Sequence, residues 1–492
     1  MSESSKPMDR GLNFEAVAPH LVTDTRDLLQ ILQPGDHSIR DHRAIRGFSV
    51  DSRTIGEGEV FVAIPGARVD GHRFVGQALS RGAAAVLVSN PESVGDEQAC
   101  IRVGDTVKAL GKLATAHRRA LKTRFIGLTG SVGKTTTKDM IHAILSSTWR
   151  VRKSEGNFNN TIGLPIQILR CTDQDIWMVA EMGMSTPGEI AKLMHMAQPE
   201  IGLWLSVHAV HQANFADLDG IARAKAELVQ NLDPRKTLVY NLDNPHVHRY
   251  AKDFPGKKIT YGMLHPDAGI QARPTSLPTW DETRFQLLLP RDARLSLRLH
   301  LPGAFNIGNA LAACATALAA GFPQSELHNG LRHLQTGTGR CRLHHLDGEI
   351  YLVDDTYNAS PHAVGQVLRA FAALAAKHYR WLILGDMLEL GKEELTIHRR
   401  LGRELASYGF DRITLVGPLS DATRKGLTEA ASRRRNVRNL KVEHFADADE
   451  AISRMDPYAP EGARIWCKAS RGIALEKVAR FLLESFAHQK DH

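Results

Sequence analysis

Apolar and polar positions alternate with recognisable periods along the middle of the chain. Short apolar runs at 125–129, 176–180, 201–207 and 237–241 are separated by stretches with helical spacing, such as 189–196. Strands that alternate with helices are typical of a mostly parallel sheet covered by helices on both faces. The pattern therefore predicts an α/β domain in the middle of the chain.

Two further regions flank this unit and predict a division into three domains. About forty N-terminal residues, which we expect to be irregular, lead into strand-like runs at 60–64 and 84–88. A second alternating unit with apolar runs such as 381–384 occupies the C-terminal part. At roughly 100–200 residues per domain, a chain of 492 residues fits three domains. We expect a small α/β domain over 1–120, a central mostly parallel sheet flanked by helices over 121–336, and a Rossmann-like α/β domain over 337–492.

The balance of charge is basic, but it does not indicate a nucleic-acid surface. The formal net charge of +8 favours acidic partners such as phosphorylated substrates. The densest basic run, at 433–435, has no aromatic residues interleaved with it, so we interpret it as solvated surface. We therefore expect small-molecule substrates and no nucleic-acid partner.

Cysteine usage and hydropathy favour a cytoplasmic location. The five cysteines are scattered and form no CxxC pair, which argues for a reducing compartment. No apolar run follows a basic start, and the most apolar helix-like stretch, at 310–320, is too short to span a bilayer. We expect a cytoplasmic monomer without membrane insertion.

The strongest local signal is a glycine-rich turn between an apolar run and a predicted helix. In such a turn, backbone N–H groups converge on phosphate oxygens, and the helix N-terminus adds partial positive charge. Lys134 would reach the β- and γ-phosphates of ATP, and Thr135 would ligate Mg²⁺. The expected phosphate-binding residues are Gly130, Ser131, Val132, Gly133, Lys134, Thr135 and Thr136.

The form of this turn departs from most P-loop NTPases. The general pattern GxxxxGK[ST] would place its first glycine at position 128, where Leu128 stands. Gly-Ser-x-Gly-Lys-Thr after a strand is similar instead to the Mur ligases and their folate and cyanophycin relatives. The resemblance to the Mur ligase family covers nearly the whole chain and is closest to the branch that adds a terminal D-alanyl-D-alanine. Its most branch-specific motifs lie at 354–359 and 385–391.

This resemblance implies an activity and a set of catalytic residues. A Mur ligase of this branch joins D-alanyl-D-alanine to a UDP-N-acetylmuramoyl-tripeptide with ATP and Mg²⁺, through an acyl phosphate. Glu181 ends an apolar strand, where an α/β sheet binds ligands, and hard oxygen ligands suit Mg²⁺. The resemblance implies that His211 is a second metal ligand. It also implies that Lys225 is carbamylated and holds or orients the second Mg²⁺.

Further residues are assigned by the same resemblance. Asn306 and Asn309 would begin the adenine-binding helix, Arg340 would meet ATP phosphates, and Asp355 would meet the ribose. Residues from all three domains would bind the UDP-linked peptide or the dipeptide. They are Asp51, Ser52, Arg53, Gly71, His72, Asn157, Asn159, Asn160, Thr161, Asn358, Lys468, Ser470 and Arg471.

Two other interpretations stay open on the sequence. The first is a Mur-type ligase that adds an amino acid in place of a dipeptide; the 385–391 motif and the Asn-rich 157–160 loop count against it. The second is a P-loop NTPase that drives binding to nucleic acid or a protein partner. The shifted glycine and the lack of an aromatic-basic surface count against that class.

Overall fold

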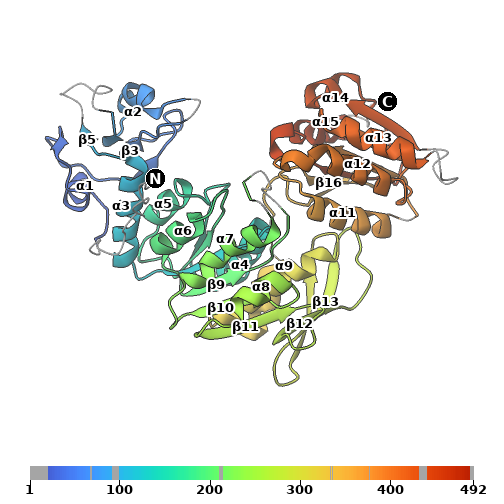
Figure 1. Ribbon diagram of the computed structural model, residues 1–492, viewed down its shortest axis with the longest axis horizontal. Helices are drawn as coiled ribbons and strands as arrows, with labels where there is room; N and C mark the ends of the chain where they lie inside the picture. The colour runs from blue at the N-terminus through green and yellow to red at the C-terminus, as the bar shows by residue number, and fades with distance from the viewer. Residues whose placement is uncertain are drawn as a thin grey trace, which may run out of the picture.

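The computed structural model describes residues 20–66, 69–90, 99–209, 214–215, 217–332, 334, 336–375, 377–431 and 440–487. Within them the chain forms three sheets, each with its own helices. Figure 1 shows three bodies: the N-terminal and C-terminal domains stand apart, and the central domain joins them from below. The prediction of three α/β domains is confirmed, while the expected boundaries at 120 and 336 stay a prediction.

The N-terminal domain contains a five-stranded sheet in the order β1-β5-β4-β3-β2, with only β1 antiparallel to its neighbour. Its strands are β1 (Asp36–His37), β2 (Gly47–Ser49), β3 (Glu59–Val62), β4 (Ala85–Val88) and β5 (Cys100–Arg102). Its helices are α1 (Thr25–Leu32), η1 (Gly71–Phe74), α2 (Val75–Ser80) and α3 (Thr106–Ala120).

The expectation of an irregular N-terminal stretch is wrong at α1. Asp24 caps this helix, and Asp27 bonds back to the cap, so a capping box satisfies the free N–H groups of the first turn. Leu28 and Ile31 lie on one face and are buried in the core shared with α3.

The central domain is built on a nine-stranded sheet in the order β14-β13-β12-β11-β10-β9-β6-β8-β7. The strands from β7 to β12 are parallel, and β12, β13 and β14 form an antiparallel extension. The bounds are β6 (Arg124–Thr129), β7 (Val151–Lys153), β8 (Trp177–Glu181), β9 (Ile201–Trp204), β10 (Thr237–Asn241), β11 (Lys257–Gly262), β12 (Ile270–Pro274), β13 (Thr283–Leu288) and β14 (Arg294–Leu299).

Helices cover both faces of the central sheet, as predicted. One face packs against α4 (Lys134–Ser146), α9 (Phe305–Ala319) and α10 (Leu327–Arg332), with η3 (Gln324–Glu326) leading into α10. The other face packs against α5 (Gly163–Leu169), α6 (Glu189–Ala197), α7 (Leu218–Gln230) and α8 (Pro245–Ala251). The phosphate-loop region and the residues after β8 and β9 lie at the carboxyl ends of parallel strands, where such sheets bind ligands.

The C-terminal domain has a six-stranded sheet in the order β15-β16-β20-β17-β18-β19, parallel except for β15. The strands are β15 (Arg342–Leu346), β16 (Ile350–Asp355), β17 (Arg380–Gly385), β18 (Arg412–Val416), β19 (Lys441–Phe445) and β20 (Arg464–Lys468). The helices are α11 (Pro361–Leu374), η4 (Gly391–Glu393), α12 (Glu394–Leu405), α13 (Ser420–Ala431), α14 (Ala448–Arg454), η6 (Arg471–Ile473) and α15 (Glu476–Ala487).

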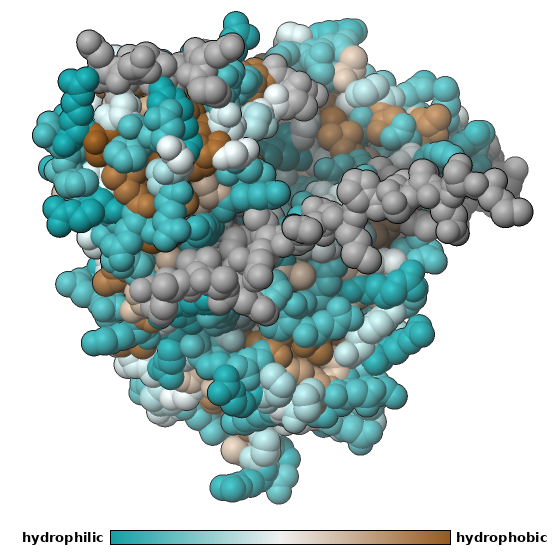
Figure 2. Space-filling model, turned by 60° about the vertical axis from the view of Figure 1, so that its left-hand side comes forward, coloured by the Kyte–Doolittle hydropathy of each residue, from teal (hydrophilic) through white to brown (hydrophobic). Residues whose placement is uncertain are grey.

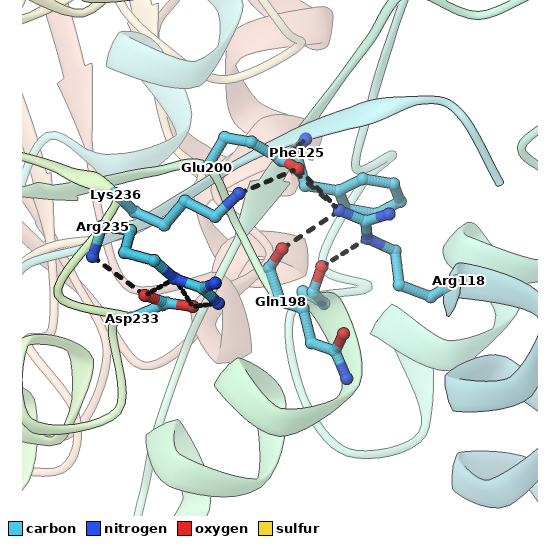
Figure 3. A network of polar contacts seen from close by, with 8 residues as sticks. Arg118, Phe125, Gln198, Glu200, Asp233, Arg235 and Lys236 are labelled. Atoms are coloured by element: carbon cyan, nitrogen blue, oxygen red, sulfur yellow. Dashed lines mark hydrogen bonds and ion pairs between the residues drawn. The ribbon is translucent and has the colours of Figure 1, made fainter. Parts of the chain in front are cut away.

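Helix α3 ties the N-terminal domain to the central one through a buried arginine (Figure 3). The Arg118 guanidinium donates to the carbonyl oxygens of Ala197 (2.7 Å) and Gln198 (3.0 Å) and to Glu200 (3.2 Å). Glu200 also accepts the backbone N–H of Phe125 at the start of β6. These contacts join α3 directly to the sheet of the central domain.

A different contact joins the central and C-terminal domains. Trp280, in the loop between β12 and β13, is 6% exposed. Its ring lies among aromatic side chains of the C-terminal core, with centroids 5.7 Å from Phe371, 6.0 Å from Trp466 and 6.3 Å from Tyr351. The central domain therefore inserts this side chain deeply into the core of its neighbour.

One face of the molecule is mostly polar where its residues are described (Figure 2). On the face seen in Figure 2, hydrophilic residues dominate and apolar residues form separate small groups. Among the described residues, no helix is both long and apolar enough to cross a membrane.

Candidate active site

The glycine-rich turn takes the geometry of a phosphate loop. It runs from the end of β6 to the start of α4, and Gly133 caps the helix with φ +82°. A Cβ on Gly133 would lie 2.4 Å from Asn309 Oδ1, so both its backbone conformation and the space around it require glycine. Lys134 Nζ donates to the carbonyl oxygen of Gly130 at 2.7 Å.

The loop faces a cleft of about 600 Å³ between the central and C-terminal domains. Central-domain residues predicted from the sequence to bind ATP or metal lie on one wall, and C-terminal ones lie on the other. The predicted residues that line the cleft are Ser131, Val132, Gly133, Lys134, Thr135, Thr136, Asn159, Asn160, Glu181, Lys225, Asn306, Asn309, Arg340, Asp355, Asn358, Lys468, Ser470 and Arg471. His211 lies outside the described residues.

Glu181 is the buried acid of the site. It is 3% exposed at the end of β8, and its carboxylate accepts from Thr135 Oγ1 (2.7 Å) and Asn159 Nδ2 (3.0 Å). Burial alone would raise its pKa, but the cations of Lys138, Lys134 and Arg340 outweigh burial and hold the pKa below its ordinary value. An ionised carboxylate beside a hydroxyl is a hard oxygen set that fits Mg²⁺.

Lys138 is a residue of this site that the sequence interpretation missed. Its ammonium is 3.6 Å from Glu181 Oε2 and 4.0 Å from Asp139, and its side chain is 3% exposed. Asp139 pairs in turn with Lys153 at 2.8 Å. The signal was present, because Lys138 follows Lys134 by four residues and so lies on the same face of α4.

Lys225 is buried on α7 and lines the cleft. It is 1% exposed, and none of the described residues gives its Nζ a hydrogen bond or an ion pair. Burial, followed by repulsion from Lys134, lowers the pKa of Lys225 well below its ordinary value. Both effects favour the neutral amine of Lys225, which is the form that reacts with CO₂.

The C-terminal wall contains a second charged group. Lys468 Nζ donates to Asp355 Oδ2 at 2.7 Å and to the carbonyl oxygen of Asn358 at 3.0 Å. The Arg340 guanidinium stacks on the ring of Tyr357, 3.8 Å from its centroid. The face of Tyr357 therefore holds this guanidinium in the cleft, where it adds positive potential at Lys134.

The asparagines at the start of α9 form a chain of amide contacts. Asn306 is buried and donates to the carbonyl oxygen of Pro302 at 3.0 Å, and Asn309 Nδ2 donates to Asn306 Oδ1 at 3.2 Å. In the 157–161 loop, Asn159 faces Glu181, whereas Asn160 Oδ1 accepts the backbone N–H of Gly163 at 2.8 Å. Asn157 and Thr161 are not among the residues that line the cleft.

The candidates of the N-terminal domain lie apart from the cleft. Asp51 pairs with Arg53 at 2.7 Å, and hydrogen bonds from Arg53 lower the pKa of Asp51 to about 2. Ser52 donates to Gln77 at 2.7 Å. His72 follows Gly71 at the start of η1.

His72 is buried, and the protein uses both of its ring nitrogens. Nδ1 contacts Asp70 at 2.6 Å, and Nε2 accepts the backbone N–H groups of Ser89 (2.9 Å) and Asn90 (3.2 Å). This histidine holds two loops of the N-terminal domain together.

Comparison with known proteins finds a Mur ligase domain in each of the three parts of the chain. Residues 128–317 match the Mur ligase middle domain, residues 339–471 match the Mur ligase glutamate ligase domain, and residues 44–118 match the Mur ligase family catalytic domain. The UDP-N-acetylmuramoyl-tripeptide–D-alanyl-D-alanine ligase of Bacillus subtilis is 34% identical over 90% of this chain and 94% of its own length. The Escherichia coli ligase of the same name is 34% identical over 89% of this chain and 93% of its own.

Solved structures give the same result. A crystal structure of MurF from Acinetobacter baumannii is 28% identical and covers 95% of this chain and 99% of its own, with a TM-score of 0.79. MurF from Thermotoga maritima in complex with ADP is 25% identical over 90% of this chain and 98% of its own, with a TM-score of 0.77. A phosphate loop facing a cleft between two α/β domains and full-length similarity to these ligases lead to one conclusion: the chain belongs to the Mur ligase family.

Proposed function

We propose that this protein joins D-alanyl-D-alanine to a UDP-N-acetylmuramoyl-tripeptide with ATP, in the synthesis of peptidoglycan precursors. The observation that carries the proposal is the cleft itself, in which the phosphate loop faces Arg340 and Lys468 from another domain. The similarity to ligases named for this reaction over about nine-tenths of the chain supports the choice of substrates.

The reaction divides into two steps. A carboxylate oxygen of the tripeptide attacks the γ-phosphorus of ATP, and the bond to the ADP oxygen breaks, which leaves an acyl phosphate and ADP. The amine nitrogen of the dipeptide then attacks the acyl carbon. The carbon–oxygen bond to phosphate breaks, phosphate leaves, and the amine loses a proton.

Side chains that line the cleft would supply binding and charge for these steps. Lys134 and Arg340 would bind the transferred phosphoryl group, because phosphoryl transfer depends chiefly on positioning and neutralisation of charge. The C-terminal domain would cover the acyl phosphate and exclude water. Thr135 and Glu181, with His211, would hold Mg²⁺, which neutralises phosphate charge when it is bound.

Lys225 has a separate proposed role. Its neutral amine would add CO₂ to give a carbamate, with loss of a proton from nitrogen. The carbamate would place a negative charge near Lys134, in place of an ammonium that Lys134 repels. Its buried position without a partner among the described residues supports this role.

Binding of the two peptide substrates is also part of the proposal. Asp51, Ser52, Arg53, Gly71 and His72 would form the uridine-nucleotide region, with His72 acting through the loops that it holds. Asn157, Asn159, Asn160 and Thr161 would meet the UDP-linked peptide, and Asn358, Lys468, Ser470 and Arg471 would meet the dipeptide or the peptide carboxylate. We further propose that the enzyme acts as a cytoplasmic monomer; its five free cysteines are consistent with a reducing compartment.

One assay tests the proposed reaction. Purified protein is incubated with Mg·ATP, a panel of UDP-muramoyl peptides and either D-alanyl-D-alanine or single amino acids, and products are identified by mass spectrometry. The expected product is a UDP-linked pentapeptide, formed only with the dipeptide. A product with a single amino acid would support the other type of Mur ligase, and ATP hydrolysis stimulated by nucleic acid would support the NTPase interpretation.

A further inference from the structure

Two histidine rings stack across the cleft. His208 follows β9 in the central domain, and His362 lies in the first turn of α11 in the C-terminal domain. Their ring centroids are 3.6 Å apart with the planes inclined by 16°, and both side chains line the cleft. The stack therefore joins the two walls of the cleft directly.

His208 is fixed to the phosphate loop by its backbone. Its N–H donates to Ser131 Oγ at 2.9 Å, and Ser131 Oγ donates to the His208 carbonyl oxygen at 3.0 Å. The backbone N–H of Ser131 also donates to the carbonyl oxygen of Ser206 at 2.9 Å. A displacement of His208 would therefore displace the phosphate loop.

His362 is held on the opposite wall through its neighbours in the chain. It stands two residues after Ser360, which is buried and caps α11. Ser470 Oγ donates to the carbonyl oxygen of the neighbouring Ala359 at 3.3 Å. The stack thus connects the phosphate loop with the two segments that carry Asn358 and Ser470 to the cleft.

Both rings are neutral at physiological pH. Burial, followed by His362 and His246, lowers the pKa of His208 to about 4. Burial and then Arg369 lower the pKa of His362. Neutral rings stack without the charge repulsion that two imidazolium ions would bring.

The stack differs from the Trp280 contact between these domains. Trp280 is inserted in the core of the C-terminal domain, so this contact between the domains can break only if that core opens. His208 and His362 are half-buried at the cleft and can part without unpacking a core. The Trp280 contact therefore suits an axis about which the C-terminal domain rotates. The histidine stack suits a contact that limits this rotation.

We propose that His208 and His362 are positioning residues, whose stack sets the C-terminal domain against the phosphate loop so that Arg340 and Asp355 face the nucleotide. The proposal deepens the proposed function and rests on it for its kinetic effects. Neither ring takes part in the proposed bond-making steps. Loss of either ring therefore acts only through the arrangement of the two walls of the cleft. Nucleotide affinity then falls while UDP-substrate affinity is kept.

The test compares alanine with a ring that can still stack. His208→Ala and His362→Ala are each expected to raise KM for ATP between about two- and tenfold, the range of an aromatic pair. The double variant is expected to be no worse than either single variant, because one contact is lost in all three. His362→Phe should restore most of the loss. His246→Ala, which removes a nearby ring outside the stack, is the control.

Small-angle scattering of the substrate-free protein provides a readout that needs no activity. The alanine variants are expected to have a larger radius of gyration than the wild type and His362→Phe. Unchanged scattering and KM, or additive losses in the double variant, would overturn the proposal. A separate result tests the proposed function, which is wrong if the wild type does not form the pentapeptide. In that case the scattering result still decides whether the stack holds the two domains together.

Discussion

Replacement of Lys138 by methionine removes the ammonium that lies against Glu181 while it keeps most of the aliphatic stem. At 3.6 Å, and with an effective dielectric constant of about 20, this charge pair is worth about 5 kcal/mol. Loss of one partner from a buried ion pair typically costs about 3–5 kcal/mol, since the other charge stays buried. We therefore expect Lys138→Met to be strongly destabilised.

The assay is thermal unfolding followed by calorimetry, in EDTA and in Mg·ATP. For a domain of 150–250 residues, 1 kcal/mol corresponds to about 2–4 °C, so the central-domain transition should fall by at least about 6 °C in EDTA. A divalent cation beside Glu181 would replace part of the lost charge. Mg·ATP should accordingly raise the transition of Lys138→Met more than that of the wild type.

Lys153→Met is the matched control. Lys153 belongs to the same series of ion pairs, through Asp139, but lies nearer the surface. The Lys153 side chain is 32% exposed and pairs with Asp139, so its loss should cost no more than about 1 kcal/mol. The Lys138–Glu181 pair does not stabilise the site if Lys138→Met in EDTA unfolds at the temperature of the wild type. The same conclusion follows if its unfolding temperature is lowered no more than that of Lys153→Met.

Further predictions concern the two other lysines of the cleft and the substrates. Lys134→Ala should lower turnover at least ~10³-fold, as loss of a main electrostatic group does, while isothermal titration still detects binding of the UDP-substrate; near-normal ligation would exclude the phosphate-loop role. Lys225→Ala should be nearly inactive, and formate or acetate should restore part of its activity; full activity without either would contradict the carbamate. Since the pKa of Lys225 is lowered in the folded state, the unfolded chain binds more protons, and this group's contribution to stability rises with pH until the pH passes the ordinary lysine pKa of 10.5. In EDTA and CO₂-free buffer at pH 7, Lys225→Met should therefore unfold at a higher temperature than the wild type, and a lower temperature would argue against a neutral buried amine. ATP turnover, measured by release of phosphate, should be negligible without the UDP-peptide, and rapid substrate-free hydrolysis would oppose the ligase mechanism.

Local sequence signals predicted the elements that carry strong periodicity. The glycine-rich turn, the run before it and helix α4 lie where the pattern placed them, because their signals are contained in about twenty consecutive residues. Strands β7 and β19 were not predicted. Both are half-exposed and rich in charge, so they lack the apolar run or alternation by which a strand is recognised.

The residues of the candidate site likewise divide into those with a local sequence signal and those without one. The phosphate loop, Glu181 and Lys225 were predicted by motif and by family resemblance, since each lies in a short recognisable segment. Lys138 was missed because a lysine in the second turn of a helix is usually solvated. Its burial depends on Glu181, which is 43 positions away in the chain and belongs to another element.

The sequence by itself determined the fold class, the phosphate loop and the family, because each is written in local spacing or in motif order. Tertiary structure alone decided which side chains meet across domains. The insertion of Trp280 among Phe371 and Trp466, and the stack of His208 on His362, join residues with no common local pattern. Such contacts depend on how folded domains pack, and the free energy of that packing is shared among distant residues, so no short segment records it.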